Sequence, residues 1–193
     1  MKKEMTAILF GAAMLTVATL TGANFRVDLQ VYKNTCGLKF KEASEGVRGE
    51  KASWMKEKAH CRLMVMGKSE ENWKEKRFQF TADEDCLISL EFMANPDRKK
   101  RPWIAYDNVR IEGAEIKNGS FEQINPKRGL PGNWSTFPKT KMVLKTGDDA
   151  ADGKNYVETT HDHRAMQLIK CKKDVPVTIT FMVRDAKRTT EVK

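Results

Sequence analysis

The chain has 193 residues, of which 40% are hydrophobic and 32% are charged, and its formal net charge is +9. This length allows one large or two small folded domains. After residue 23 no apolar run is long enough to cross a bilayer, so we expect no membrane span in that part of the chain.

The first predicted element is an export signal. Lys2 and Lys3 precede an uncharged run over residues 6–20, and small residues follow at 21–23. A basic start, an apolar run shorter than the ~20 residues of a membrane span, and then small residues are typical of a secretory signal peptide. We therefore expect a signal peptide over residues 1–23, cleavage after Ala23, and a secreted or periplasmic protein over residues 24–193.

The positive charge gives limited information about a partner. Loss of Lys2, Lys3 and Glu4 lowers the net charge from +9 to +8. Export argues against nucleic acid and points to anionic glycans, cell-wall polymers or lipid headgroups. Because the charge is spread along most of the chain, solubility alone is the simpler interpretation.

The exported part of the chain is dominated by a period of two residues. Phe25, Val27, Leu29 and Val31 alternate with polar residues, which is the pattern of a strand with one buried face. A helical turn is plausible only over residues 43–58, where two glycines weaken it. The pattern predicts eleven strands, over residues 25–31, 37–41, 61–66, 76–82, 86–94, 104–111, 118–122, 141–145, 155–159, 165–170 and 177–183. Many short strands separated by turn residues indicate an all-β protein, with an antiparallel β-sandwich or jelly roll as its fold.

Two groups of motifs resemble a known family. "IKNGSFEQ" followed by "GLPGNW", and "ENWKEKRFQFTADEDCLISLEFMA" followed by "WIAYDNVRI", are similar to the two ends of a galactose-binding-like jelly roll. This is the architecture of many bacterial carbohydrate-binding modules. The resemblance implies that Trp73 and Trp134 anchor the core and that residues 118–122 form the entry strand.

The order of the motifs departs from that family. The exit half comes first and the entry half second, so the chain is either one circularly permuted sandwich over residues 24–193 or two incomplete tandem modules over 24–116 and 117–193. A half-sandwich would leave an apolar face and strand edges in water. We therefore favour the single permuted sandwich, joined by a tight hairpin at residues 112–114.

The resemblance also implies a function. It predicts a secreted, non-catalytic carbohydrate-binding module that binds a glycan or cell-envelope polysaccharide, with Trp54, Tyr32 and Trp103 as candidate ligand-binding aromatics. It further implies a structural calcium ion near Asp107 and Glu122, which would need help from backbone carbonyls or from a loop such as 148–152. A structural or adhesive β-sandwich of the cell envelope, without sugar affinity, is the alternative.

Signals for catalysis are few, and we predict that the protein is not an enzyme. His161 and His163 would lie on one face of a strand, but two histidines in a polar segment are more often solvated. His60 and Cys61 are adjacent, and adjacent strand residues point to opposite faces, which is poor geometry for a thiol and its base.

The cysteines leave their pairing open. Their number is even, and an oxidising compartment would allow up to two disulfides. No pair has the C-x-x-C spacing of a zinc ribbon or a redox site. The four, Cys36, Cys61, Cys86 and Cys171, could equally be buried thiols.

Overall fold

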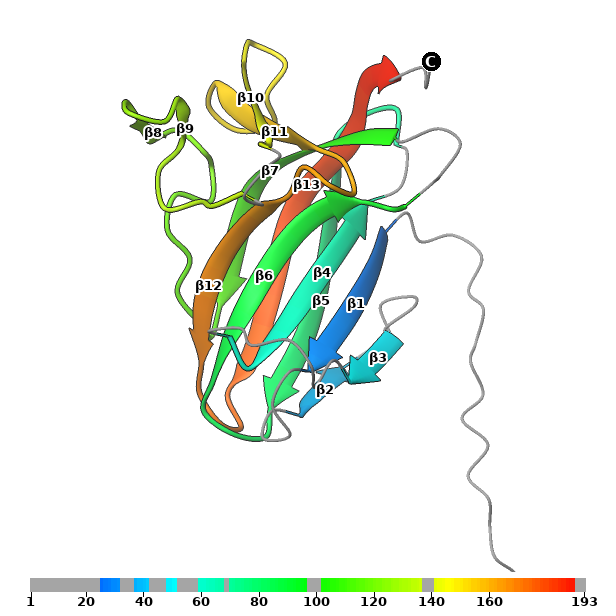
Figure 1. Ribbon diagram of the computed structural model, residues 1–193, viewed down its shortest axis with the longest axis vertical. Coiled ribbons are helices and arrows are strands. Elements are labelled where there is room, and N and C mark those ends of the chain that lie inside the picture. Colours follow the sequence, from blue (N-terminus) through cyan, green and yellow to red (C-terminus); the bar gives the residue numbers. More distant parts are fainter. Residues whose placement is uncertain are drawn as a thin grey trace, which may run out of the picture.

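The computed structural model describes residues 25–31, 37–41, 48–51, 59–67, 70–96, 102–136 and 141–189. These residues form strands β1 to β13 and contain no helix. Two large sheets pack face to face, with β8 and β9 and the β10–β11 hairpin at one end (Figure 1). The predicted all-β sandwich is therefore confirmed.

The first sheet has five strands in the order β12-β6-β4-β1-β3. The β4–β6 and β1–β3 pairs are parallel, and the other two pairs are antiparallel. The strands span β1 Phe25–Val31, β3 Arg48–Lys51, β4 Cys61–Gly67, β6 Cys86–Ala94 and β12 Ala165–Cys171. Strand β3 falls within the segment for which the sequence suggested a helical turn.

The second sheet has six strands in the order β10-β11-β7-β13-β5-β2, and every pair is antiparallel. The strands span β2 Leu38–Lys41, β5 Lys74–Ala82, β7 Pro102–Glu112, β10 Val143–Thr146, β11 Asn155–Thr159 and β13 Pro176–Thr189. A separate two-stranded ribbon consists of β8 Ile124–Asn125 and β9 Leu130–Pro131.

The core lies between the two large sheets. Alternate residues of β4, β5, β6, β12 and β13 face inward, as the period-two pattern predicts, and they form most of one hydrophobic cluster. Phe92 of β6 packs its ring 5.0 Å from Tyr106 of β7 and 5.3 Å from Phe181 of β13, measured between ring centroids. Strands from before and after residue 116 pair in both large sheets and share this cluster, so neither segment forms either sheet alone.

The segment after β7 differs from its prediction. Residues 118–122 are not a strand, because Asn118 and Phe121 have positive φ angles of 54° and 60°. The Asn118 side chain instead donates to the carbonyls of Gln123 and Gly132 and accepts from the Gln123 N–H. The segment still lies beside β7, since the Val109 N–H donates to the Gly119 carbonyl at 2.9 Å.

Trp134 anchors this segment to the core, as predicted. It is 1% exposed and lies 5.0 Å from Phe121 and 6.1 Å from Phe92 between ring centroids. Its indole N–H donates to the Asn118 carbonyl. Within the described ranges, the chain has no helix with the length and apolar character needed to cross a membrane.

Candidate functional site

The outer face of the six-stranded sheet carries a cluster of aromatic and charged side chains around Ala105. Ile104 and Tyr106 of β7 point into the core, so Trp103, Ala105 and Asp107 point outward. Glu158 of β11 and Arg184 of β13 are the cross-strand partners of Ala105. We call this part of the sheet, formed by Trp103, Ala105, Asp107, Tyr156, Glu158 and Arg184, the Ala105 face. Trp103 is half-buried and the other five residues are buried.

Arg184 is held between two aromatic rings at one end of the Ala105 face. Its guanidinium carbon lies 4.6 Å from the Trp73 ring centroid and 5.1 Å from the Tyr156 centroid. The two rings meet edge to face, with centroids 5.6 Å apart. Cation–π attraction is strong when the cation is shielded from water, and Arg184 is only 6% exposed. The stack therefore fixes both the guanidinium and the two rings.

Asp149, in the loop that joins β10 to β11, completes this stack. Its Oδ2 lies 2.5 Å from Arg184 Nη2 and accepts from the Tyr156 hydroxyl at 3.3 Å. Its backbone carbonyl accepts from the Trp73 indole N–H at 2.7 Å. The hydrogen bond from Arg184 holds the pKa of the Asp149 carboxyl below its usual range. The ionised carboxylate is 57% exposed, so part of it faces solvent.

The carboxylates of Asp107 and Glu122 accept hydrogen bonds from the backbone of residues 147–155, which comprise the β10–β11 loop and the first residue of β11. Asp107 Oδ2 accepts the N–H groups of Ala151 and Asp152, at 2.8 and 2.9 Å. Glu122 Oε1 accepts the N–H groups of residues 154 and 155, and its Oε2 accepts the Asn155 side-chain amide. The two predicted metal-site residues are thus brought to one loop, which rises beside β10 and β11 in Figure 1.

This geometry suits N–H donors better than a cation. The two oxygens that face the loop each accept two N–H groups, and Asp107 Oδ1 accepts the Asn108 N–H. Burial raises the pKa of the Asp107 carboxyl to about 6. In the part of the chain that the structure describes, no three His, Cys, Asp or Glu side chains are placed to hold a metal ion. The calcium ion stays a prediction from the resemblance.

Trp103 lies at the other end of the Ala105 face. It is half-buried, and its ring is 5.0 Å from the His163 ring, with an angle of 35° between the planes. His163 is fixed in turn by Thr160, whose Oγ1 is 2.7 Å from Nδ1 of the imidazole. Trp54 and Tyr32, the other two predicted ligand-binding aromatics, lie outside the described residues.

The prediction that Trp73 anchors the core was wrong. Trp73 is half-buried, lies outside the hydrophobic cluster and packs on the outer side of the six-stranded sheet. The polar residues around it, Glu71, Asn72 and Lys74, were the available signal for a surface position. Tyr156 and Arg184 were not predicted, because their contacts join separate loops and strands. Asp149 was named only as part of a loop that could help to hold calcium.

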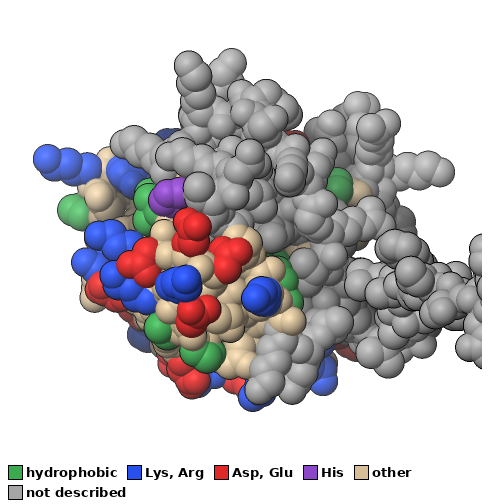
Figure 2. All heavy atoms as spheres, turned by 90° about the horizontal axis from the view of Figure 1, so that it is seen from below, with side chains coloured by type: hydrophobic (Ala, Val, Ile, Leu, Met, Phe, Trp, Pro, Cys, Tyr) green, Lys and Arg blue, Asp and Glu red, His purple; other side chains and the backbone are tan. Residues whose placement is uncertain are grey.

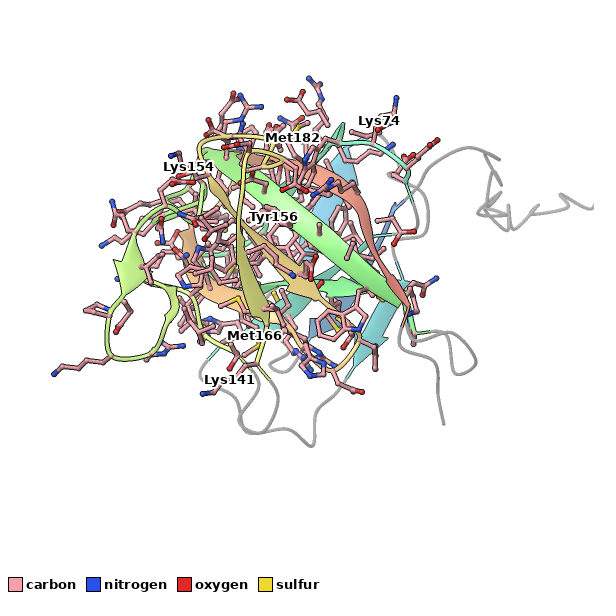
Figure 3. All side chains as sticks on the ribbon, turned by 90° about the horizontal axis from the view of Figure 1, so that it is seen from above. Lys74, Lys141, Lys154, Tyr156, Met166 and Met182 are labelled. Carbon is pink, nitrogen blue, oxygen red and sulfur yellow. The ribbon has the colours of Figure 1, made fainter. Side chains whose placement is uncertain are left out.

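A groove of about 460 Å³ lies away from this site, along the edge of β12. The side chains of Leu168 and Lys170 point out from β12 at this edge. The lining, Glu115, Lys117, Asn133, Ser135, Gln167, Leu168 and Lys170, contains no aromatic residue. The two surfaces therefore differ in the ligand chemistry they offer. In Figure 3, which views the molecule from above, Met182 of β13 and Met166 of β12 lie on opposite sides. The two sheets that carry the site and the groove are therefore on opposite sides of the molecule.

Comparison with known proteins yields no relative. No family model, no curated protein and no solved structure matches this chain. The galactose-binding-like resemblance therefore rests on the sequence motifs, and the function has to be argued from the site.

Proposed function

We propose that the protein is a secreted, non-catalytic carbohydrate-binding protein whose glycan lies across the Ala105 face. One observation carries the proposal: two half-buried tryptophans, Trp73 and Trp103, border one sheet face that also offers the exposed Asp149 carboxylate. Sugars bind where an aromatic ring packs on the apolar side of the pyranose and nearby polar groups bind its hydroxyls.

Trp103 and Trp73 lie at opposite ends of the Ala105 face. Trp103 and Ala105 are two residues apart on one face, which is about 6.6 Å along a strand. Arg184 and Glu158 flank Ala105 on the neighbouring strands. Ala105, Arg184 and Glu158 are buried, so a glycan would contact the half-buried rings of Trp73 and Trp103 and the exposed side chain of Asp149.

The polar groups of the proposed site are fixed before any ligand binds. Asp149 belongs to a loop whose backbone is held by Asp107 and Glu122, and its carboxylate is oriented by Arg184. A site that is already ordered loses less conformational entropy on binding than a flexible one. We assign Asp149 as the acceptor for sugar hydroxyl groups.

Binding without catalysis is the role that these groups favour. The Asp107 and Glu122 carboxylates are engaged with backbone N–H groups, so we assign them to positioning the loop and give them no part in a reaction. The predicted export signal supports a glycan or cell-envelope polysaccharide as the partner.

The test is binding of the purified protein to a panel of neutral and sulfated glycans at low and moderate salt, with calcium or a chelator in parallel samples. The proposal predicts saturable binding that survives moderate salt, because ring packing is not screened by ions. We expect Trp73→Ala and Trp103→Ala each to weaken binding at least tenfold, which corresponds to about 1.4 kcal/mol.

Leu168→Ala is the matched control, because it removes an exposed apolar side chain, 48% accessible, from the groove on the other sheet. It should leave binding unchanged. Binding that is restricted to sulfated glycans and lost at moderate salt would indicate only a basic surface. If a folded sample binds no glycan of the panel, the proposal is rejected and the structural or adhesive role is favoured. A requirement for calcium would support the cation that the resemblance implies.

A further inference from the structure

Three buried cysteines lie in a row across the five-stranded sheet. Cys61 is on β4, Cys86 on β6 and Cys171 on β12, and these strands are neighbours in the order β4-β6-β12. All three are at most 6% exposed and belong to the hydrophobic cluster between the sheets. They are therefore on the same side of the sheet.

The strand register distinguishes between the possible disulfide pairs. Cys86 and Cys171 are direct cross-strand partners in the antiparallel β6–β12 pair. Residues directly opposite each other have Cα atoms about 4.5 or 5.5 Å apart, and a disulfide accepts a Cα separation of about 4.4 to 6.8 Å. The register alone thus gives this pair a suitable separation, and the Cys171 thiol is in hydrogen-bond contact with Cys86.

Cys61 is offset from this pair. Its partner on β6 is Ile88, two residues along the strand from Cys86. A diagonal neighbour two residues away lies about 7–8 Å off, beyond the roughly 7 Å at which two cysteines can be bridged without backbone movement. The register therefore favours the directly opposite pair, Cys86 and Cys171, over the offset pair of Cys61 and Cys86.

We propose that Cys86 and Cys171 form a cross-strand disulfide and that Cys61 remains a buried thiol. The oxidant is a small-molecule or protein disulfide, such as glutathione disulfide. One protein thiolate attacks it and releases one thiol, and the second protein thiolate attacks the mixed disulfide and releases the other. Two electrons and two protons pass from the cysteine pair to the oxidant, and one S–S bond forms while another breaks.

The bond forms while the chain folds. In the folded protein both sulfurs are buried, and contact with Cys86 together with burial raises the pKa of the Cys171 thiol, which suppresses the reactive thiolate. Once formed, the disulfide is protected by the same burial. It joins β6 of the first segment to β12 of the second, so it ties together the two segments whose order departs from the resembled family.

Cleavage after methionine tests the pairing, because it places the four cysteines in separate fragments. Cyanogen bromide should place Cys36 in the fragment that ends at residue 55, and Cys61, Cys86 and Cys171 in fragments 56–64, 67–93 and 167–182 respectively. The full chain is refolded in reduced and oxidised glutathione, its remaining thiols are alkylated without reduction, and it is then cleaved in acid and weighed. We expect 67–93 joined to 167–182, lighter by two hydrogen atoms than their sum, and 56–64 alkylated.

The change in Tm on reduction tests the Cys86–Cys171 disulfide independently. Reduction should lower the Tm of the oxidised protein by on the order of 10 °C, because the bond closes a long loop between β6 and β12. Cys86→Ala and Cys171→Ala should abolish this shift, and the control Cys61→Ala, equally buried in the same sheet, should keep it. Linkage of either cysteine to Cys36 or Cys61, or four alkylated cysteines in folded protein, would overturn the proposal.

Discussion

Gly153 occupies a position in the 147–155 loop that a larger residue would strain. Its φ angle is +64°, and a Cβ atom there would lie 2.5 Å from Glu122 Oε1. The close approach is what lets Glu122 reach the N–H groups of residues 154 and 155. The glycine thus makes the carboxylate-to-loop contact possible.

We expect Gly153→Ala to lower the free energy of unfolding by about 1–3 kcal/mol, from the left-handed backbone and the displaced carboxylate together. Urea denaturation of both proteins measures this. Gly129→Ala is the matched control, because Gly129 also has a positive φ, +60°, but its Cβ would meet nothing within 4 Å. Equal losses in both variants would show that Glu122 has no part in holding the loop.

Asp107 should leave a signature in the pH dependence of stability. Burial raises the pKa of its carboxyl from 3.8 to about 6. Between these values the unfolded chain releases the proton and the folded protein keeps it, so this group makes stability fall as pH rises from about 4 to about 6. Because asparagine does not titrate, the stability of the Asp107→Asn variant should lack this pH-dependent contribution.

The measurement is urea denaturation of wild type and Asp107→Asn at several pH values between 4 and 7. The free energy of unfolding of wild type, minus that of the variant, should decrease across the window from about pH 4 to about pH 6. A difference that stays flat or rises with pH would mean that the three N–H groups outweigh burial and that the pKa is not raised.

At the scale of elements, Tyr106 connects the two sheets through the core. It belongs to β7 of the six-stranded sheet, and its hydroxyl accepts from the Gly67 N–H and donates to the Met93 carbonyl of the five-stranded sheet. Gly67 is required at this crossing, because a Cβ atom would lie 2.6 Å from the Tyr106 hydroxyl oxygen. The ends of β4 and β6 are therefore fixed to β7 by one phenol.

Tyr106→Phe should lower the free energy of unfolding by about 1–3 kcal/mol, because it leaves a buried N–H and a buried carbonyl without their partner. Denaturation by urea gives the value. Tyr156→Phe is the comparison, since its hydroxyl makes one longer bond of 3.3 Å to a largely exposed carboxylate. A loss in Tyr106→Phe no larger than in that variant would contradict a bridging role.

Strands were predictable where alternation governs them, and the site was predictable only in part. Burial in β12 alternates along the strand, so its sequence pattern sufficed. Residues 118–122 failed because the side-chain hydrogen bonds of Asn118 hold a left-handed backbone, which a period-two pattern cannot reveal. Asp107 and Glu122 were named from the resemblance, whereas the contact of Arg184 with Asp149 depends on strand order that a single sequence does not encode visibly.

On the scale of the whole molecule, the positive charge does not gather on the end seen in Figure 2. Basic and acidic side chains are interleaved there. Lys172 and Asp85, from the β12–β13 and β5–β6 turns, form one mixed pair at 2.7 Å. Interleaved charges favour solubility over attraction of a polyanion. Among the described residues at this end, the pattern therefore does not indicate a polyanion-binding patch.

The decisive measurement is the map of backbone amide shifts when isotope-labelled protein is titrated with the strongest glycan of the panel. We predict saturable shifts at Trp73, Trp103, Ala105 and Arg184, and unchanged amides along the β12 groove at Gln167 and Leu168. Shifts confined to the groove, or none at saturating glycan, would contradict a carbohydrate site on the Ala105 face.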